Sequence, residues 1–181
     1  MGFSFVTMTL MRNILTQTFF NRPALRVGRE LLGCFLCRRV GKRIVRLEIT
    51  EVEAYGGPKD KASHAHRGQT KRNAPMFGEA GKWYVYFTYG MHWMLNIVTG
   101  PEGYPAAVLI RGTKKIVGPA RLTKFLKINK RFNGKKASHK TGLWIEKGTT
   151  IQKRGIKKTP RVGVSYAGKV WSEKPYRFLK I

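Results

Sequence analysis

Acidic residues are scarce in this 181-residue sequence, which has 9 Asp and Glu against 36 Lys and Arg and a formal net charge of +27. Such an imbalance destabilises a compact protein by self-repulsion unless a polyanion or counterions screen it. Nucleic acid is therefore the expected partner class. An anionic membrane is less favoured, because no basic amphipathic helix with a wide apolar face is evident. The excess lies mainly in residues 111–160, which hold 16 basic residues and 1 acidic residue.

Long hydrophobic runs are absent as well. No stretch reaches about 18 apolar residues, so no membrane-spanning helix is predicted. The hydrophobic content of 42% is nevertheless enough for a real core, which excludes an intrinsically disordered chain. No repeat and no linker divides the sequence, so residues 1–181 are expected to form one domain. Residues 1–13 lack the features of a signal peptide and are expected to be a disordered or dispensable extension.

Cysteine is limited to Cys34 and Cys37. On a strand, their odd spacing would point the sulfurs to opposite faces, where they can neither form a disulfide nor share a metal. No second pair completes a zinc site. His64 and His66 form an HxH pattern, but no third ligand is evident nearby. We expect packing cysteines in a reducing compartment and no metal.

The apolar pattern predicts a series of short elements. A helix is expected over residues 22–33, two strands over residues 34–55 and a hairpin over residues 83–98. A buried strand ending at Arg111 precedes a helix that starts at Gly118. The expected core stripe of that helix is Leu122, Phe125 and Leu126, and a last strand is expected over residues 161–166.

Two carboxylates stand at the end of the second of these strands. By the period of two, one face of the strand carries Val45, Leu47, Ile49, Glu51, Glu53 and Tyr55. A strand whose core-facing side chains become acidic toward its end can place a carboxylate in a cleft. The alternative is that this end emerges into solvent. With only nine acids in the whole sequence, the two glutamates are candidate site residues, and Arg111 could meet them in a cleft or lie exposed.

Donor-rich and aromatic segments follow. The loop over residues 64–73 is almost entirely composed of hydrogen-bond donors that suit phosphate oxygens. At the tip of the predicted hairpin, Tyr89 and Met91 could form a wedge between base pairs. Alternatively, the hairpin folds back on its own domain. The start of the helix at Gly118 is a further candidate phosphate contact.

In this order, the segments resemble the alkyladenine (3-methyladenine) DNA glycosylase family. The matching stretches are residues 19–25, 30–33, 50–58, 64–73, 76–77, 84–96, 107–111, 118–123 and 161–168, so that about residues 14–178 are covered. The resemblance implies a mixed α+β domain around a curved, open-barrel-like antiparallel sheet, with flanking helices and a protruding DNA-intercalating β-hairpin. It implies neither a metal nor a cofactor. The chain lacks the long insertion that larger relatives have before Gly118, so it is similar to compact bacterial members.

The resemblance also implies roles for individual residues. The general base that activates water is Glu53, assisted by Arg111 and the backbone carbonyl of Val162. The remaining roles are a base pocket (Tyr55, His64, Tyr86 and Asn96), a DNA-intercalating wedge (Tyr89 with Met91) and contacts to the DNA backbone (Arg67, Lys71, Arg72, Gly118, Arg121 and Thr123). Glu51 is expected to be structural.

The implied reaction is the flipping of a damaged purine out of double-stranded DNA and hydrolysis of its N-glycosidic bond. One carboxylate suffices, because an alkylated purine is cationic and leaves without prior protonation, unlike a sugar oxygen. The expected substrates are 3-methyladenine and 7-methylguanine, with hypoxanthine and ethenoadenine as further candidates. The enzyme is expected to be a cytoplasmic, nucleoid-associated monomer.

The alternative class is a non-catalytic, basic nucleic-acid-binding protein. The net charge supports it equally well, because neutralising phosphates requires no particular reaction. The strand with the two glutamates favours the enzyme, because a pure binder gains nothing from a carboxylate in a positive cleft.

Overall fold

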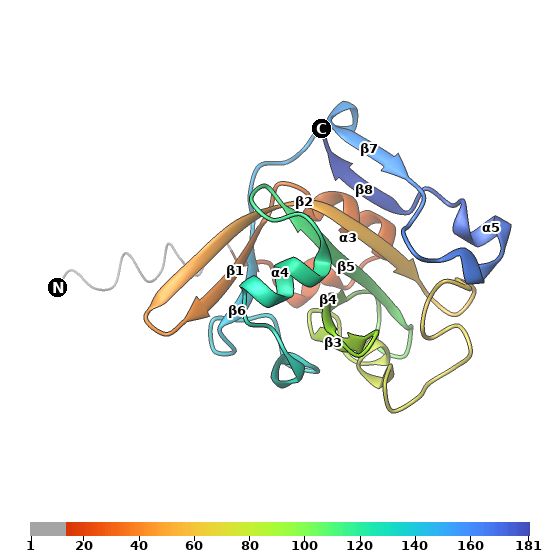
Figure 1. Ribbon diagram of the computed structural model, residues 1–181, viewed down its shortest axis with the longest axis horizontal. Helices are drawn as coiled ribbons and strands as arrows, with labels where there is room; N and C mark the ends of the chain where they lie inside the picture. Colours follow the sequence, from red (N-terminus) through yellow and green to blue (C-terminus); the bar gives the residue numbers. More distant parts are fainter. Residues whose placement is uncertain (1–13) are drawn as a thin grey trace.

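The computed structural model describes residues 14–181 (Figure 1), so the expectation for residues 1–13 lies outside the described residues. In chain order the elements are α2 (Gln17–Phe20), α3 (Ala24–Leu31), β1 (Phe35–Val40), β2 (Arg43–Gly56), η1 (Ala74–Phe77), β3 (Trp83–Thr88), β4 (His92–Val98), β5 (Ala106–Thr113), α4 (Pro119–Phe125), η2 (Lys130–Phe132), β6 (Leu143–Glu146), η3 (Lys153–Gly155), β7 (Ile156–Thr159), η4 (Ser165–Ala167), α5 (Lys169–Ser172) and β8 (Arg177–Lys180).

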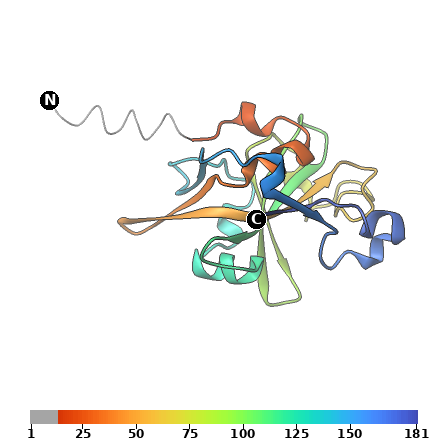
Figure 2. The same cartoon turned by 90° about the horizontal axis from the view of Figure 1, so that it is seen from above.

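The strands form one antiparallel sheet in the order β3-β4-β5-β2-β1-β6, and β8 pairs with both β2 and β7. The 14-residue strand β2 joins the two parts of this sheet, because the first half of β2 pairs with β1 and the second half pairs with β5 and β8. The sheet curls strongly, as Figures 1 and 2 show. The expected single mixed α+β domain around a curved antiparallel sheet is confirmed.

Part of the core lies between α3 and the sheet. Val27 and Leu31 are fully buried on the face of α3 that packs on β2 and β5, and each contributes about 1.5–3 kcal/mol through burial. Gly28 allows a close approach, because a Cβ at this position would lie 3.3 Å from the Phe178 ring of β8. The second half of β2, which carries the two glutamates, thus pairs with β5 and β8 and packs against α3.

The predicted β3–β4 hairpin is present and extends away from the body in Figure 2. Its turn centres on Tyr89 and Gly90, whose φ angles are 53° and 64°, and the Met91 N–H donates to the Thr88 carbonyl at 3.1 Å. Positive φ at both central positions is typical of a type I′ turn. Tyr89 and Met91 are 79% and 68% exposed, so neither side chain folds back into the core.

Two expectations about elements are wrong. Residues 161–166 form an irregular loop that ends in η4, because Gly163 has a φ of 73° and the Arg161 side chain turns inward to Asp60. The terminal strand is instead β8. In α4, Phe125 is 57% exposed, because the buried face of this short helix runs through Leu122 and Thr123.

Both cysteines are buried, free thiols, and burial raises the pKa of each. None of the helices in residues 14–181 has the length and hydropathy needed to cross a membrane.

Candidate active site

A cavity of about 280 Å³ opens beside the second half of β2. Most of the side chains around it come from β2, the loop that follows β2, β5, the β3–β4 hairpin and the loop that follows β7. Its lining includes every residue expected for catalysis and for the base pocket, together with one of the two wedge residues: Glu53, Tyr55, His64, Tyr86, Tyr89, Asn96, Arg111 and Val162. Residues separated by more than 100 positions in the sequence thus meet at one site.

Glu53 is buried and receives donors from three segments. Its Oε1 accepts a 2.8 Å hydrogen bond from the Val162 N–H and lies 3.4 Å from Nη1 of Arg111. Its Oε2 accepts a 2.8 Å hydrogen bond from the Tyr55 hydroxyl. A buried charge is costly unless it is paired and hydrogen-bonded, and these donors supply such partners. The contact from Val162 is made by its amide, and the expected role of its carbonyl stays a prediction.

A β-bulge aims Arg111 at this carboxylate. The register between β2 and β5 shifts on either side of Glu51, which pairs with Gly112, while Val52 pairs with Ile110. Arg111 lies between these two pairs and has no partner of its own. A bulged residue leaves the regular alternation of the ladder, and bulges commonly re-aim side chains next to active sites.

Glu51 holds Arg111 in place. Its Oε1 accepts hydrogen bonds from Nε of Arg111 at 2.8 Å and from Nε of Arg177 at 2.7 Å. Burial lowers the pKa of Arg111, but the charges of Glu53 and Glu51 outweigh burial and raise it above its ordinary value. The guanidinium therefore stays charged between the two carboxylates, and the structural role expected for Glu51 agrees with these contacts. Arg177 was missed, because no local pattern in the C-terminal segment marks it.

Aromatic side chains form the walls of the cavity. The ring centroids of His64 and Tyr86 lie 4.6 Å apart, and His64 Nδ1 lies 3.0 Å from the hydroxyl of Tyr84. Burial, and then the charge of Arg72, lower the pKa of His64. Burial raises the pKa of Tyr84 to about 12, and it raises the pKa of Tyr55 well above its ordinary value. The walls are therefore uncharged at neutral pH and present electron-rich rings.

Asn96 lies between two strands, opposite Tyr84 on β3 and Leu109 on β5. It is buried, and its side-chain amide donates to the Tyr84 carbonyl at 3.1 Å. This bond fixes a polar group in a surface of the cavity that is otherwise apolar and aromatic. Tyr84 lines the cavity as well, although its place in an aromatic strand gave no sign of this.

The family model described as "Methylpurine-DNA glycosylase (MPG)" matches residues 18–117 and 113–180. The chain belongs to this family. It is 40% identical over 185 residues to a protein of Methanocella arvoryzae, with 91% of each chain covered. It is 41% identical over 189 residues to one of Streptomyces avermitilis, covering 92% of this chain and 87% of the relative. Both relatives are named "Putative 3-methyladenine DNA glycosylase". The protein is a DNA N-glycosylase.

The glycosylase carries part of its predicted DNA contacts on the loop over residues 64–73. Arg67 and Lys71 are exposed. Arg72 is exposed too, but it also donates to the Phe87 carbonyl at 3.0 Å and so ties the loop to the hairpin. The buried side chain of Asn73, whose role was missed, donates to two carbonyls of the loop at 2.9 and 3.0 Å and fixes its shape.

The remaining predicted contacts surround the start of α4. Gly118 caps the helix with a φ of 97° and Arg121 is exposed. Thr123 is only 2% exposed, and its hydroxyl donates to the Trp93 carbonyl at 2.8 Å. This side chain therefore anchors α4 to β4, and the expected contact between Thr123 and the DNA backbone stays a prediction.

Proposed function

We propose that the protein is a monofunctional glycosylase that flips alkylated purines out of duplex DNA and hydrolyses their N-glycosidic bond, leaving an abasic site. The observation that carries the proposal is the buried carboxylate of Glu53 beside a cavity with aromatic walls, held by Arg111, Tyr55 and the Val162 amide. A carboxylate positioned in this way beside a cavity can act as a general base toward water.

In the proposed reaction, the bond between C1′ of the sugar and the purine nitrogen breaks, and its electron pair passes to the base. A cationic alkylated purine becomes neutral in this step and requires no general acid. Water attacks C1′ of the oxocarbenium-like sugar while Glu53 accepts the proton of the water. Arg111 then keeps its ion pair with Glu51, so the protonated Glu53 is not left beside an unpaired cation.

The proposed substrates are 3-methyladenine and 7-methylguanine. Cation–π attraction to the rings of Tyr55 and Tyr86 favours a cationic base by about 0.5–2 kcal/mol. Flipping costs a few kcal/mol and costs least for weakly paired bases, so part of the selection precedes the chemistry. Asn96 is proposed to disfavour the amino group of normal guanine. Hypoxanthine and ethenoadenine are further candidates, and neutral hypoxanthine additionally requires a proton as it leaves.

Binding to DNA is assigned to the hairpin and the basic surface around the cavity. Tyr89 is proposed to fill the space left by the flipped base, with Met91 beside it. Arg67, Lys71 and Arg121 are proposed to contact phosphates. All of these residues come from one chain, so a monomer suffices for the proposed activity.

Excision by the Glu53→Gln variant tests this function. Wild-type protein is incubated with methylated duplex DNA, and abasic sites are revealed as alkali-dependent strand breaks. We expect Glu53→Gln to bind duplex DNA normally but to lose at least about 100-fold in excision rate, because removal of a general base has this scale. The matched control is Glu102→Gln, the same change at an exposed carboxylate.

Retained excision in Glu53→Gln would refute the assigned base. If the wild-type protein bound duplex DNA but produced no breaks on any lesion, the non-catalytic nucleic-acid-binding alternative would stand instead.

A further inference from the structure

A buried ion pair joins two chain segments beside the cavity. The guanidinium of Arg161 meets the carboxylate of Asp60 in a bidentate arrangement, with Nη1 to Oδ2 at 2.6 Å and Nη2 to Oδ1 at 2.9 Å. Both side chains are fully buried. We propose that this pair is a positioning device for the general base: it holds the Val162 amide and the Tyr55 ring against Glu53. The inference rests on the proposed role of Glu53.

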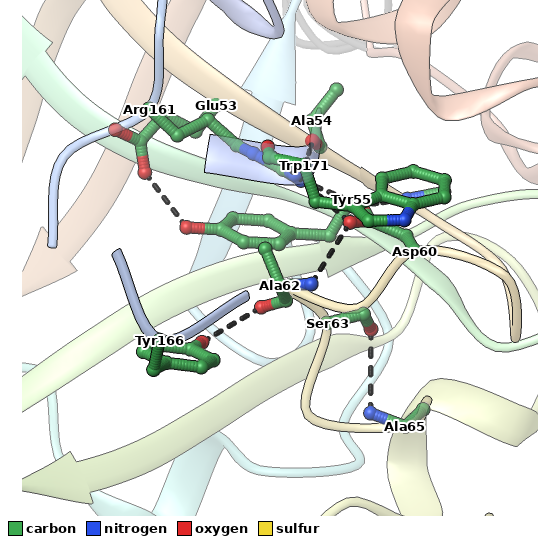
Figure 3. A network of polar contacts seen from close by, with 11 residues as sticks. Glu53, Ala54, Tyr55, Asp60, Ala62, Ser63, Ala65, Arg161, Tyr166 and Trp171 are labelled. Atoms are coloured by element: carbon green, nitrogen blue, oxygen red, sulfur yellow. Dashed lines mark hydrogen bonds and ion pairs between the residues drawn. The ribbon is translucent and has the colours of Figure 1, made fainter. Parts of the chain in front are cut away.

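Arg161 directly precedes the residue whose amide contacts the base. Val162 lies in the irregular loop after β7 and is not part of a strand, yet its N–H donates to Glu53 Oε1 at 2.8 Å. Arg161 Nη1 also donates to the carbonyl of Ala54 at 3.0 Å, and Ala54 follows Glu53 on β2. Arg161, which precedes the donor Val162, is thus bonded to Ala54, which follows the acceptor Glu53. Figure 3 shows Arg161, Ala54 and Glu53 within this network.

The same guanidinium supports a second donor to the base. Its Cζ lies 4.7 Å from the ring centroid of Tyr55, and the Tyr55 hydroxyl donates to Glu53 Oε2 at 2.8 Å. Two of the three groups that contact Glu53 therefore depend on the position of Arg161. The third, Arg111, is held separately by Glu51.

Asp60 fixes Arg161 and also closes the turn after β2. Its carboxylate accepts 3.1 Å hydrogen bonds from the N–H groups of Gly56 and Ala62. Ala62 in turn lines the cavity, and its carbonyl accepts a hydrogen bond from Tyr166 at 2.9 Å. Burial lowers the pKa of Arg161, but its bonds to Asp60, together with nearby Tyr55 and Glu53, outweigh burial and raise it, so the guanidinium stays charged.

The ion pair between Asp60 and Arg161 is better suited to orienting the guanidinium than to stabilising the fold. A buried ion pair contributes little more than apolar side chains of similar size, because desolvation offsets its attraction. Two parallel N–H···O bonds do fix the orientation of a guanidinium. The orientation of Arg161 in turn decides where the next peptide group, that of Val162, points.

The test is the double variant Asp60→Leu/Arg161→Met, which removes both charges and leaves no unpaired charge in the interior. We expect its single-turnover excision rate at saturating enzyme to fall by about 10- to 100-fold, because a misplacement of about 1 Å has this scale. Affinities for lesion-containing and undamaged duplexes should change little. A wild-type excision rate in this variant would overturn the inference.

The control is Arg46→Met/Glu146→Gln, which breaks the 2.8 Å ion pair between β2 and β6 and keeps an acceptor for the Trp144 indole N–H. This variant should excise like the wild type. If the first double variant does not fold, Arg161→Lys decides: it retains the charge but loses the bidentate geometry, and it should show the same fall in rate at unchanged DNA affinity.

A combination of substitutions distinguishes a positioning role of the Asp60–Arg161 pair from a merely structural one, because effects on excision that act through the same residue are not additive. In the Glu53→Gln background, Asp60→Leu/Arg161→Met should cause almost no further loss of residual excision, because the pair acts through Glu53. An additive loss would contradict the inference. Its failure is distinguishable from that of the proposed function: if Glu53→Gln alone leaves excision intact, the base is wrongly assigned, whatever the pair does.

Discussion

Six charged side chains in and around the cavity form a set without net charge, although the protein as a whole carries +27. The set consists of Glu51, Glu53, Asp60, Arg111, Arg161 and Arg177. Such pairing offsets the cost of burying each charge. At the scale of residues, the site is therefore an electroneutral cluster within a strongly basic protein.

Tyr89 combines an exposed ring with an unfavourable backbone conformation. Its φ of 53° costs a residue other than glycine about 1–3 kcal/mol. We expect Tyr89→Gly to raise the free energy of unfolding by about 1 kcal/mol while weakening binding to a lesion-containing duplex more than to undamaged duplex. Thermal unfolding and fluorescence anisotropy measure the two effects. Ile44→Ala, at the exposed β1–β2 hairpin, is the control. Equal losses on both duplexes would mark Tyr89 as an ordinary surface contact.

His64 should make the binding of cationic bases dependent on pH. Its pKa is lowered, so the ring is neutral at pH 7 and becomes charged only below the ordinary value of about 6.5. With non-cleaving Glu53→Gln protein, we expect affinity for 7-methylguanine duplexes to fall as the pH drops below about 6.5, because His64 then repels the base. Affinity for neutral hypoxanthine duplexes should fall less. In His64→Phe the two lesions should respond alike, and a persisting difference would exclude His64 as the cause.

At the scale of elements, the bulge between β2 and β5 is the decisive feature. Regular alternation puts Glu51 and Glu53 on one face of β2, but only the bulge lets Arg111 reach both of them from β5. Gly112 leaves room for this arrangement, because a Cβ at this position would lie 3.2 Å from Glu51 Oε2. The active site thus depends on the absence of a side chain as well as on those present.

Gly112→Ala tests whether the bulge between β2 and β5 tolerates an added side chain. We expect the added methyl group to press on Glu51, destabilise the fold by about 1–3 kcal/mol and lower the excision rate by displacing Arg111. Denaturant unfolding and single-turnover excision measure both. Gly56→Ala, in the same pair of strands, is the control, because a Cβ at this position would meet nothing within 4 Å. Similar effects of both substitutions would show that any change in β2–β5 has this consequence.

At the scale of the whole molecule, few acidic side chains remain to offset the excess of basic side chains on the surface. Seven of the nine acidic residues take part in ion pairs: Glu30, Glu48, Glu51, Glu53, Asp60, Glu79 and Glu146. No acidic residue occurs between Glu102 and Glu146. The excess of lysines in the second half is therefore available to phosphates.

Lys124→Gln/Lys127→Gln/Lys130→Gln tests this surface, since all three lysines are exposed around the C-terminal end of α4. We expect the slope of log K against log salt concentration for undamaged duplex to fall by about 0.9 for each lysine that contacts a phosphate. The excision rate at saturating enzyme should not change. The control neutralises Lys153, Lys157 and Lys158 on the β7 side of the molecule (Figure 1). Equal changes of slope in both variants would show diffuse attraction rather than a binding surface.

Much of the fold could be predicted because its signals are local. The periodicity of β2, the aromatic hairpin and the Gly118–Pro119 helix start each predicted an element that the structure contains. The errors concern places where distant contacts override the local pattern. Residues 161–166 look like a strand but bend around the buried Arg161, and Phe125 fits an apolar stripe but lies beyond the buried face of a short helix.

The sequence by itself determined the charge, the main elements from α3 to α4 and, through its resemblance to a known family, the residues expected around the cavity. Only the tertiary structure decided how these residues are held. Arg161 meets Asp60 across 101 positions and Arg177 meets Glu51 across 126. Such pairs produce no periodic pattern, because their geometry arises when the curled sheet brings the C-terminal segment against β2. The positions of the donors around Glu53 are therefore a property of the folded sheet.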